Sequence, residues 1–352
     1  MGAGCMLSND PRLFRQFVND LVEWLRGKGR ILIVAHDAPD PDALASACAL
    51  QALILVRTGQ EAVITYGGVI GRRENRVMVE ELGIEAVPIH LLDLDLFDVV
   101  CMVDTQPGVG NNAWPPERPV HVVIDHHPLR EGTARCHWVD VREEFGACAT
   151  ILYEYLVVKG VYISTRLATM LFYAIKTETQ DLGREWVKAD RDAYQELIPL
   201  CNNHILARIV HPKVPQDYFV SFHRAMAGAR IYDKVLVFDL HNVANPDIVA
   251  EMADFLLRAE GVETVFGLAE CNGGQVLSMR TDREDLSAGT ILRDIVGELG
   301  HAGGHGRIAG GQIPLASADA ANRRRLVTTL KRRLFAALEV SNRRGQRLLS
   351  PR

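Results

Sequence analysis

The sequence predicts an α/β protein, in which a doubly wound, mostly parallel sheet is followed by a smaller α/β domain. Three observations favour this class. Short apolar runs alternate with helix-like segments over residues 1–180, which is typical of parallel sheets with covered faces. Strand-like runs resume in the last third of the chain, after a stretch without them. The length of 352 residues suits two domains of about 150–200 residues each.

Four apolar runs in the first half have the length of buried strands. These are Arg30–Ala35, Ala62–Tyr66, Phe97–Val103 and Pro119–Ile124. The helix-like segments are Asp42–Val56, Arg73–Leu82, Phe145–Val158 and Thr165–Lys176. We expect Asp42 to be the N-cap of the first helix, because aspartate accepts hydrogen bonds from free backbone N–H groups. Gly83 is expected to end the second helix.

The second half begins with a helical stretch. Helices are expected at Asp190–Leu200 and Asp217–Ile231, with Pro212 and Pro215 between them. Later strands are expected at Lys234–Leu240, Thr264–Glu270 and Gly274–Arg280, and helices at Asp247–Ala259 and Ser287–Leu299. We therefore predict a first domain at 1–205, a helical linker at 206–232 and a second domain at 233–352. The arginine-rich tail of the second domain is expected to be a solvated helix with a loose end, and the cleft between the domains is the expected active site.

Composition narrows the class of protein. A net charge of −5, 48% hydrophobic and 24% charged residues exclude a disordered, collagen-like or coiled-coil chain. Mild acidity argues against a protein that coats duplex nucleic acid by bulk charge. No apolar run is long enough to span a bilayer and the start carries no secretory signal, so no membrane association is expected. The seven cysteines include no C-x-x-C pair, which excludes a zinc ribbon and favours reduced thiols in the cytoplasm.

Polar side chains cluster where the predicted strands end. They are His36, Asp40 and Asp42 after the first strand, Asp104 after the third, Asp125, His126 and His127 at the fourth, and Glu178 and Asp181 near a helix end. The carboxyl ends of parallel strands lie at one edge of a sheet, where ligands bind. So many carboxylates would repel one another without a cation. Mixed carboxylate and imidazole ligands suit manganese, iron or zinc better than calcium, so we predict a two-metal site with a bridging carboxylate and a bridging hydroxide.

A glycine-rich stretch in the second half has the features of an anion-binding loop. Gly303 and Gly304 leave backbone N–H groups open to an anion, and His305 can donate a hydrogen bond to a phosphate. The alternative is a turn that only changes the direction of the chain. Beside a metal site, we interpret the loop as the opposing wall of the cleft, to which Arg76 adds positive charge.

These motifs resemble those of the DHH phosphoesterases. The H-x-x-x-D-x-D run at 36–42, Asp104 and the D-H-H triplet at 125–127 look like the motifs of the family's first domain. The G-G-H run at 303–305 looks like the motif of its C-terminal DHH-associated domain. The resemblance covers roughly residues 28–315.

The resemblance implies a set of metal ligands. His36, Asp40 and Asp104 would hold one metal. Asp42, Asp104, His126 and a fourth carboxylate would hold the second, with Asp104 bridging both. Two Mn²⁺ ions per chain are implied, with Mg²⁺, Co²⁺ or Fe²⁺ as substitutes.

The resemblance also implies roles around the metals. His127 would lie beside the substrate phosphate, Asp125 would orient its neighbours, and Arg280 would contact the phosphate or base of the substrate. The family has aspartate in a T/S-D-T segment for the fourth carboxylate, whereas this chain has Glu178 in T-E-T. Either Glu178 takes that place or Asp181 supplies the ligand, and we put Glu178 first.

The expected function is that of a metal-dependent phosphoesterase. The nano-RNase and pAp-phosphatase branch, which is related to RecJ, implies hydrolysis of short oligonucleotides, of 3′,5′-bisphosphonucleotides such as pAp, or of both. The expected partners are short single-stranded RNA or DNA or a mononucleotide phosphate, and a homodimer is one candidate assembly. A single-strand exonuclease and an inorganic pyrophosphatase or polyphosphatase are alternatives. A non-catalytic nucleotide-binding protein with a degenerate metal site is an alternative of another class, favoured only by Glu178.

Overall fold

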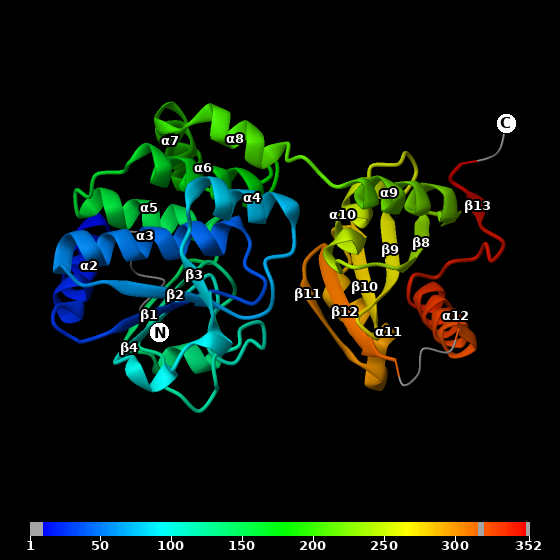
Figure 1. The fold of residues 1–352 in the computed structure, drawn as a ribbon, viewed down its shortest axis with the longest axis horizontal. Coiled ribbons are helices and arrows are strands. Elements are labelled where there is room, and N and C mark those ends of the chain that lie inside the picture. The colour runs from blue at the N-terminus through cyan, green and yellow to red at the C-terminus, as the bar shows by residue number, and fades with distance from the viewer. Residues whose placement is uncertain (1–9, 316–319, 350–352) are drawn as a thin grey trace. The chain divides into compact units, whose positions relative to one another are not determined.

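The chain divides into two compact units, Met1–Pro212 and Lys213–Arg352. The computed structural model describes residues 10–315 and 320–349 (Figure 1). Among these residues, no helix is both long enough and apolar enough to cross a membrane.

The segment 206–232, predicted as a helical linker, is shared between the two units. Helix α8 (Asn203–Val210) lies in the first unit, and helix α9 (Gln216–Gly228) and strand β7 (Arg230–Tyr232) lie in the second. Because α9 packs against a strand of the second sheet, it is an integral part of that unit.

Six parallel strands form the sheet of the first unit, in the order β3-β2-β1-β4-β5-β6 (Figure 1). They are β1 (Ile31–Val34), β2 (Ala62–Tyr66), β3 (Ala86–Pro88), β4 (Val99–Val103), β5 (Val122–Asp125) and β6 (Trp138–Val141). The predicted fold class is confirmed. The strand order reverses between β1 and β4, and open parallel sheets bind ligands at the carboxyl ends of the strands beside such a switch point.

Apolar side chains pack against both faces of this sheet. In β1, Ile31 and Ile33 join one core, while Leu32 and Val34 join the other, because successive side chains of a strand point to opposite faces. The first core contains α2 (Pro11–Leu25), α3 (Pro41–Thr58), α4 (Arg73–Leu82), α5 (Cys148–Val158), α6 (Thr165–Glu178), α7 (Lys188–Leu197) and α8. The second core is covered by loops and the 3₁₀ helices η1 (Ile89–Leu91) and η2 (Leu94–Leu96). Other 3₁₀ turns are η3 (Glu131–Arg135), η4 (Ile198–Leu200) and η5 (Gly297–Leu299).

The prediction that Asp42 caps α3 is wrong. The N-cap is Asp40, whose Oδ1 accepts hydrogen bonds from the backbone N–H groups of Asp42 (2.9 Å) and Ala43 (3.1 Å). Pro41 occupies the first helical position, where its missing N–H costs nothing. The displaced cap puts Asp42 in the first turn, with its side chain available for another contact.

Helix α2 was not predicted, although its sequence is amphipathic. Its buried side chains, at helical spacing, are Phe14, Val18, Leu21, Val22 and Leu25. Asp10 caps it and Pro11 begins it. The helix therefore covers the first core through one apolar stripe.

The second unit is built on a seven-stranded sheet in the order β11-β12-β10-β9-β8-β7-β13. Its remaining strands are β8 (Val235–Asn242), β9 (Thr264–Cys271), β10 (Gly274–Thr281), β11 (His301–His305), β12 (Ile308–Pro314) and β13 (Gln346–Arg347). Strands β8 and β9 pair in parallel, and all other described pairs of this sheet are antiparallel.

Helices cover both faces of the second sheet. One core includes α9 and α10 (Asp247–Leu256), and the other includes α11 (Ala288–Val296) and α12 (Ala320–Ala337). Helix α12 carries the arginine-rich sequence that we expected to be solvated. It instead buries Leu330, Leu334 and Phe335 in the core beside α11.

The glycine-rich stretch forms an antiparallel hairpin, not the expected loop. Gly303 pairs with Gly310 and Gly304 with Ala309 across β11 and β12. A Cβ atom on Gly289 of α11 would lie 2.0 Å from the carbonyl oxygen of Gly304. Gly289 is therefore needed for the close approach of α11 to β11.

The contact between α11 and β11 predicts a specific stability defect. We expect Gly289→Ala to destabilise the second unit by about 2–3 kcal/mol, because the added methyl group overlaps backbone that cannot move aside. Urea unfolding of the full chain would measure the change. Gly303→Ala is the matched control, since its Cβ atom would meet nothing within 4 Å. Equal stability of Gly289→Ala and wild type would refute this packing.

Candidate metal centre

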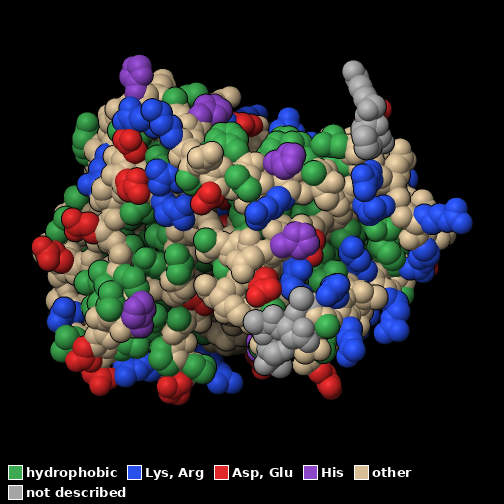
Figure 2. All heavy atoms as spheres, turned by 45° about the vertical axis from the view of Figure 1, so that its right-hand side comes forward, with side chains coloured by type: hydrophobic (Ala, Val, Ile, Leu, Met, Phe, Trp, Pro, Cys, Tyr) green, Lys and Arg blue, Asp and Glu red, His purple; other side chains and the backbone are tan. Residues whose placement is uncertain are grey.

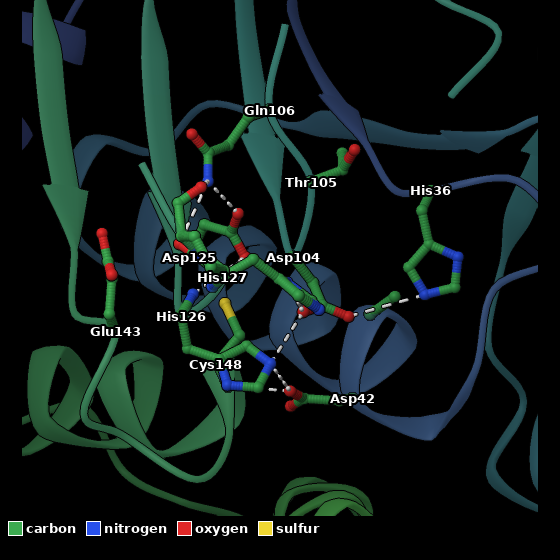
Figure 3. Close-up of polar contacts among 12 residues, drawn as sticks. His36, Asp42, Asp104, Thr105, Gln106, Asp125, His126, His127, Glu143 and Cys148 are labelled. Atoms are coloured by element: carbon green, nitrogen blue, oxygen red, sulfur yellow. Dashed lines mark hydrogen bonds and ion pairs between the residues drawn. The ribbon is translucent and has the colours of Figure 1, made fainter. Parts of the chain in front are cut away.

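Asp104 stands at the centre of a cluster at the carboxyl ends of β1, β4 and β5 (Figure 3). Its Oδ2 is 3.5 Å from His36 Nε2, and its Oδ1 is 3.4 Å from His126 Nε2 and 3.5 Å from His127 Nδ1. Asp40 Oδ1 also lies 3.5 Å from His36 Nε2. Side chains from three strand ends therefore meet around one carboxylate, where the strand order reverses.

The backbone at Asp104 is held in an uncommon conformation. Its φ is +56°, in the left-handed region, which costs a non-glycine residue about 1 kcal/mol. The N–H of Asp104 donates to the carbonyl oxygen of Ile124 at 3.1 Å, so the pairing of β4 with β5 extends into this residue. The side chain is only 2% exposed, and the turned backbone directs it into the cluster.

Asp42 is held by the N-terminus of a second helix. Its Oδ2 accepts from the N–H of Cys148 and its Oδ1 from the N–H of Ala149, both at 2.7 Å. These are unpaired N–H groups of the first turn of α5, which favour a negative charge. Burial raises the pKa of Asp42, and neighbouring Asp104 raises it further. A nearby cation would favour the ionised form, and Asp42 Oδ2 lies 3.8 Å from His126 Nε2.

Two imidazole rings are oriented by backbone carbonyl groups. His36 Nδ1 lies 2.9 Å from the carbonyl oxygen of Asp37, and His126 Nδ1 lies 3.0 Å from that of Phe145. A proton on each Nδ1 leaves Nε2 as the ligand atom toward Asp104. Burial lowers the pKa of His36, but the Asp40 and Asp104 carboxylates outweigh it and raise that pKa to about 10. The cluster thus favours positive charge at its centre.

The donor atoms fit a metal site. Asp104 Oδ1 and His126 Nε2 are buried and have no hydrogen-bond partner among the described residues, a state that costs about 1–3 kcal/mol for each polar group. Ligand atoms of His36, Asp40 and Asp104 lie within 4.8 Å of one another, as do those of Asp104, His126 and His127. Both sets contain Asp104. The residues present therefore fit two divalent cations that share this carboxylate.

The two candidates for the fourth carboxylate lie in different surroundings. Asp181 is 57% exposed, pairs with Lys176 and accepts from the Tyr194 hydroxyl at 2.9 Å. Burial raises the pKa of Glu178 to about 7, with further contributions from Asp40 and Asp104. Glu178, the last residue of α6, is therefore close enough to Asp40 and Asp104 for their charges to act on it. Asp181 lies at the surface.

Gln106 is a buried residue of the centre that sequence reasoning missed. Its Nε2 donates to Asp125 Oδ2 at 2.7 Å, and its Oε1 accepts from the N–H of Arg130 and the hydroxyl of Thr133, both at 2.8 Å. Asp125 in turn accepts through Oδ1 from the N–H of His126 (2.8 Å) and lies 2.9 Å from His127 Nδ1. The sequence signal for this role was a polar side chain, Gln106, only two positions after Asp104 at the end of a strand.

The predicted substrate-binding residues lie in both units. Arg280 on β10 is buried, and its guanidinium donates to Asp254 Oδ1 (2.5 Å), Ser278 Oγ (3.0 Å) and the carbonyl oxygens of Met279 and Ala309. Gly303, Gly304 and His305 belong to β11. Arg76 on α4 donates to the carbonyl oxygen of Gly71. The contacts of these residues with a substrate stay predictions.

Comparison with known proteins follows the same division of the chain. Residues 30–175 match the DHH family, N-terminal domain, and residues 232–334 match the DHHA1 domain. An uncharacterized protein of Methanocaldococcus jannaschii is 35% identical over 290 residues, which is 82% of this chain and 59% of that protein. The chain thus spans about three fifths of the length of this curated relative.

One of the matching solved structures has the same fold. An exopolyphosphatase-related protein from Bacteroides fragilis aligns with a TM-score of 0.72 and 14% identity, over 92% of this chain and 98% of that one. RecJ from Thermus thermophilus in complex with Mn²⁺ aligns with a TM-score of 0.47 and 16% identity, over 93% of this chain and 55% of that one.

The fold and the cluster define a two-unit α/β protein with a candidate dinuclear metal centre at the switch point of its first sheet. The chain belongs to the DHH family and carries a DHHA1 domain in its second unit. The resemblance inferred from the sequence motifs is therefore confirmed.

The contacts of Gln106 predict a positioning role. We expect Gln106→Leu to weaken metal binding by about 10–100-fold, because Asp125 and the turn that carries His126 lose their support. Calorimetric titration with Mn²⁺ would measure this affinity. Gln51→Leu, which removes an amide that donates to the carbonyl oxygen of Ala62, is the matched control in the second half of α3. An unchanged Mn²⁺ affinity in Gln106→Leu would contradict the role.

Proposed function

We propose that this protein is a Mn²⁺-dependent phosphoesterase that hydrolyses short oligonucleotides, 3′,5′-bisphosphonucleotides such as pAp, or both. The observation that carries the proposal is the buried Asp104 carboxylate, which lies within 3.5 Å of three imidazole rings. Membership of the DHH family supports phosphoester hydrolysis as the reaction class. The nucleotide substrates are inferred from the resemblance of the motifs to the nano-RNase and pAp-phosphatase branch.

Five side chains would hold the cations together with Asp104. These are His36, Asp40, Asp42, His126 and Glu178. Two divalent cations would supply Lewis-acid stabilisation of the charge that develops on the phosphoryl oxygens, and they would lower the pKa of an attacking water. Asp104 belongs to both ligand sets, so it would help to hold both cations.

His127 is the proposed proton donor to the leaving group. Asp125 Oδ1 lies 2.9 Å from His127 Nδ1 and is 1% exposed, so the imidazole ring is fixed at one nitrogen. Burial lowers the pKa of His127, but its bond to Asp125 and the charge of Asp104 raise it overall. In this proposal the ring would pass a proton to a departing oxygen atom.

The substrate class is tested by product analysis of Mn²⁺-loaded protein. We expect nucleoside monophosphates from RNAs of a few nucleotides, or AMP from pAp, and little product from a long single-stranded DNA or from pyrophosphate. Asp104→Ala and His126→Ala should lose about 10³-fold or more in turnover while keeping the wild-type circular dichroism. Activity on pyrophosphate alone would move the protein to inorganic substrates. No turnover with metal bound would favour the non-catalytic alternative.

The fourth carboxylate predicts a contrast between two variants. We expect Glu178→Gln to reduce the metal content from two ions per chain to about one and to lower turnover by about 100-fold or more. Asp181→Asn should change neither, because its carboxylate is exposed and paired with Lys176. Glu178→Asp, which restores the family's residue, should retain turnover. Elemental analysis after dialysis and steady-state kinetics would check this, and loss of metal from Asp181→Asn alone would reverse the assignment.

A further inference from the structure

The C-terminal segment of the second unit has a charge opposite to that of the rest of the chain. Residues 320–349 contain eight arginines and one lysine against a single acidic residue, Glu339, which gives a net charge of +8. The remainder of the chain carries −13. We call residues 320–349 the basic segment. Figure 2 shows Lys and Arg side chains gathered over one side of the second unit, with few Asp or Glu side chains among them.

Two arginines of the basic segment hold α12 in place within the second unit. Arg333 donates to the carbonyl oxygens of Ile295 (2.7 Å) and Val296 (3.2 Å) at the end of α11. Arg323 donates to Asp239 Oδ1 at 2.7 Å. Arg323 therefore anchors α12 to β8, and Arg333 anchors it to α11. Both guanidinium groups are engaged in contacts within the unit.

The end of the basic segment is also anchored, although we expected a loose end. Asp233 accepts from the N–H groups of Ser341 (2.7 Å) and Asn342 (3.1 Å). Further on, β13 pairs with β7 through Gln346 and Arg347. A basic surface that is already ordered loses less conformational entropy when a ligand binds than a flexible tail does.

A second set of arginines in the basic segment has exposed side chains. Its members are Arg325, Arg332, Arg344 and Arg347, whose side chains are exposed and form no ion pair with the described residues. Arg325 and Arg332 are seven residues apart and so share one side of α12. That side lies opposite the stripe of Leu330 and Leu334, which is fully buried. Packing does not account for these arginines.

The composition of the segment favours phosphate as the ligand. Arginine outnumbers lysine eight to one, and its planar fork matches phosphate oxygens and stacks on bases. The apolar side of α12 is buried in the unit's own core, so it is not available for insertion into a membrane, which an interfacial helix requires. A row of phosphates along a polynucleotide fits several exposed guanidinium groups spaced along one segment.

We propose that the basic segment binds the sugar–phosphate backbone of single-stranded nucleic acid. The choice of nucleic acid over other polyanions rests on the proposed function, whereas the binding surface itself rests on the charge and exposure of the segment. It would give the second unit an affinity for longer strands that is separate from the chemistry at Asp104. The affinity would fall with rising salt, because counterions are released on binding.

The test uses the full chain with Asp104→Ala, which removes hydrolysis from the binding measurement. Fluorescence anisotropy would follow a single-stranded RNA of about 30 nucleotides over a range of salt concentrations. We expect Arg325→Gln/Arg332→Gln to weaken binding by about tenfold and to lower the slope of log K against log salt by about 1.4. The control is Arg12→Gln/Arg15→Gln, which makes an equal charge change at two exposed residues of α2. It should change neither the RNA affinity nor the salt slope.

Three outcomes would overturn the proposal. They are equal losses in the two double variants, unchanged RNA binding in Arg325→Gln/Arg332→Gln, or a loss confined to binding of phosphatidylserine vesicles. Turnover of pAp by Arg325→Gln/Arg332→Gln with Asp104 intact should match wild type, since the change lies outside the metal centre. If wild type hydrolyses none of the tested substrates but the RNA affinities still differ as expected, the proposed function fails and the binding surface stands.

Discussion

The structure of the first unit depends on one electrostatic constraint, which is that Asp104 and its neighbouring carboxylates are buried side by side. Burial raises the pKa of Asp42 and of Glu178, and the charge of Asp104 raises both further. Hydrogen-bond donors and imidazole rings surround these carboxylates. The N-terminus of α5 faces Asp42, and three imidazole rings face Asp104. Among the described residues, Asp104 Oδ1 and His126 Nε2 still have no hydrogen-bond partner, and divalent cations would satisfy both atoms.

This constraint explains why the site lies between β1 and β4. Only at the point where the strand order reverses do two neighbouring strands send their following loops in opposite directions, which leaves a crevice at the sheet edge. The loop after β1 runs into α3, whose cap Asp40 is also a candidate ligand. The loop after β4 turns at once through the left-handed backbone of Asp104. The same local features that start a helix and end a strand thus position the ligands.

Sequence reasoning succeeded where local chemistry and topology agree. The strand-end motifs predicted the cluster because parallel strands place their carboxyl ends together. Reasoning failed where the deciding contact is distant in sequence. Gln106 matters through residues about 20 positions away, Asp125 and Arg130. Gly304 was interpreted as part of a loop because glycine favours turns, whereas in β11 its backbone lies against Gly289 of α11. Neither partner can be identified from local spacing.

Glu178 is the proposed fourth carboxylate, and its side chain is one methylene longer than that of aspartate. Aspartate at this position would place its carboxylate one methylene closer to the backbone of α6. Burial and the charges of Asp40 and Asp104 act on Glu178 together, so its carboxylate already lies within the electrostatic reach of the cluster. A surface glutamate with no share in the centre would be solvated, as Asp181 is. Under the proposed function, the extra methylene would change the distance between the helix and the cation.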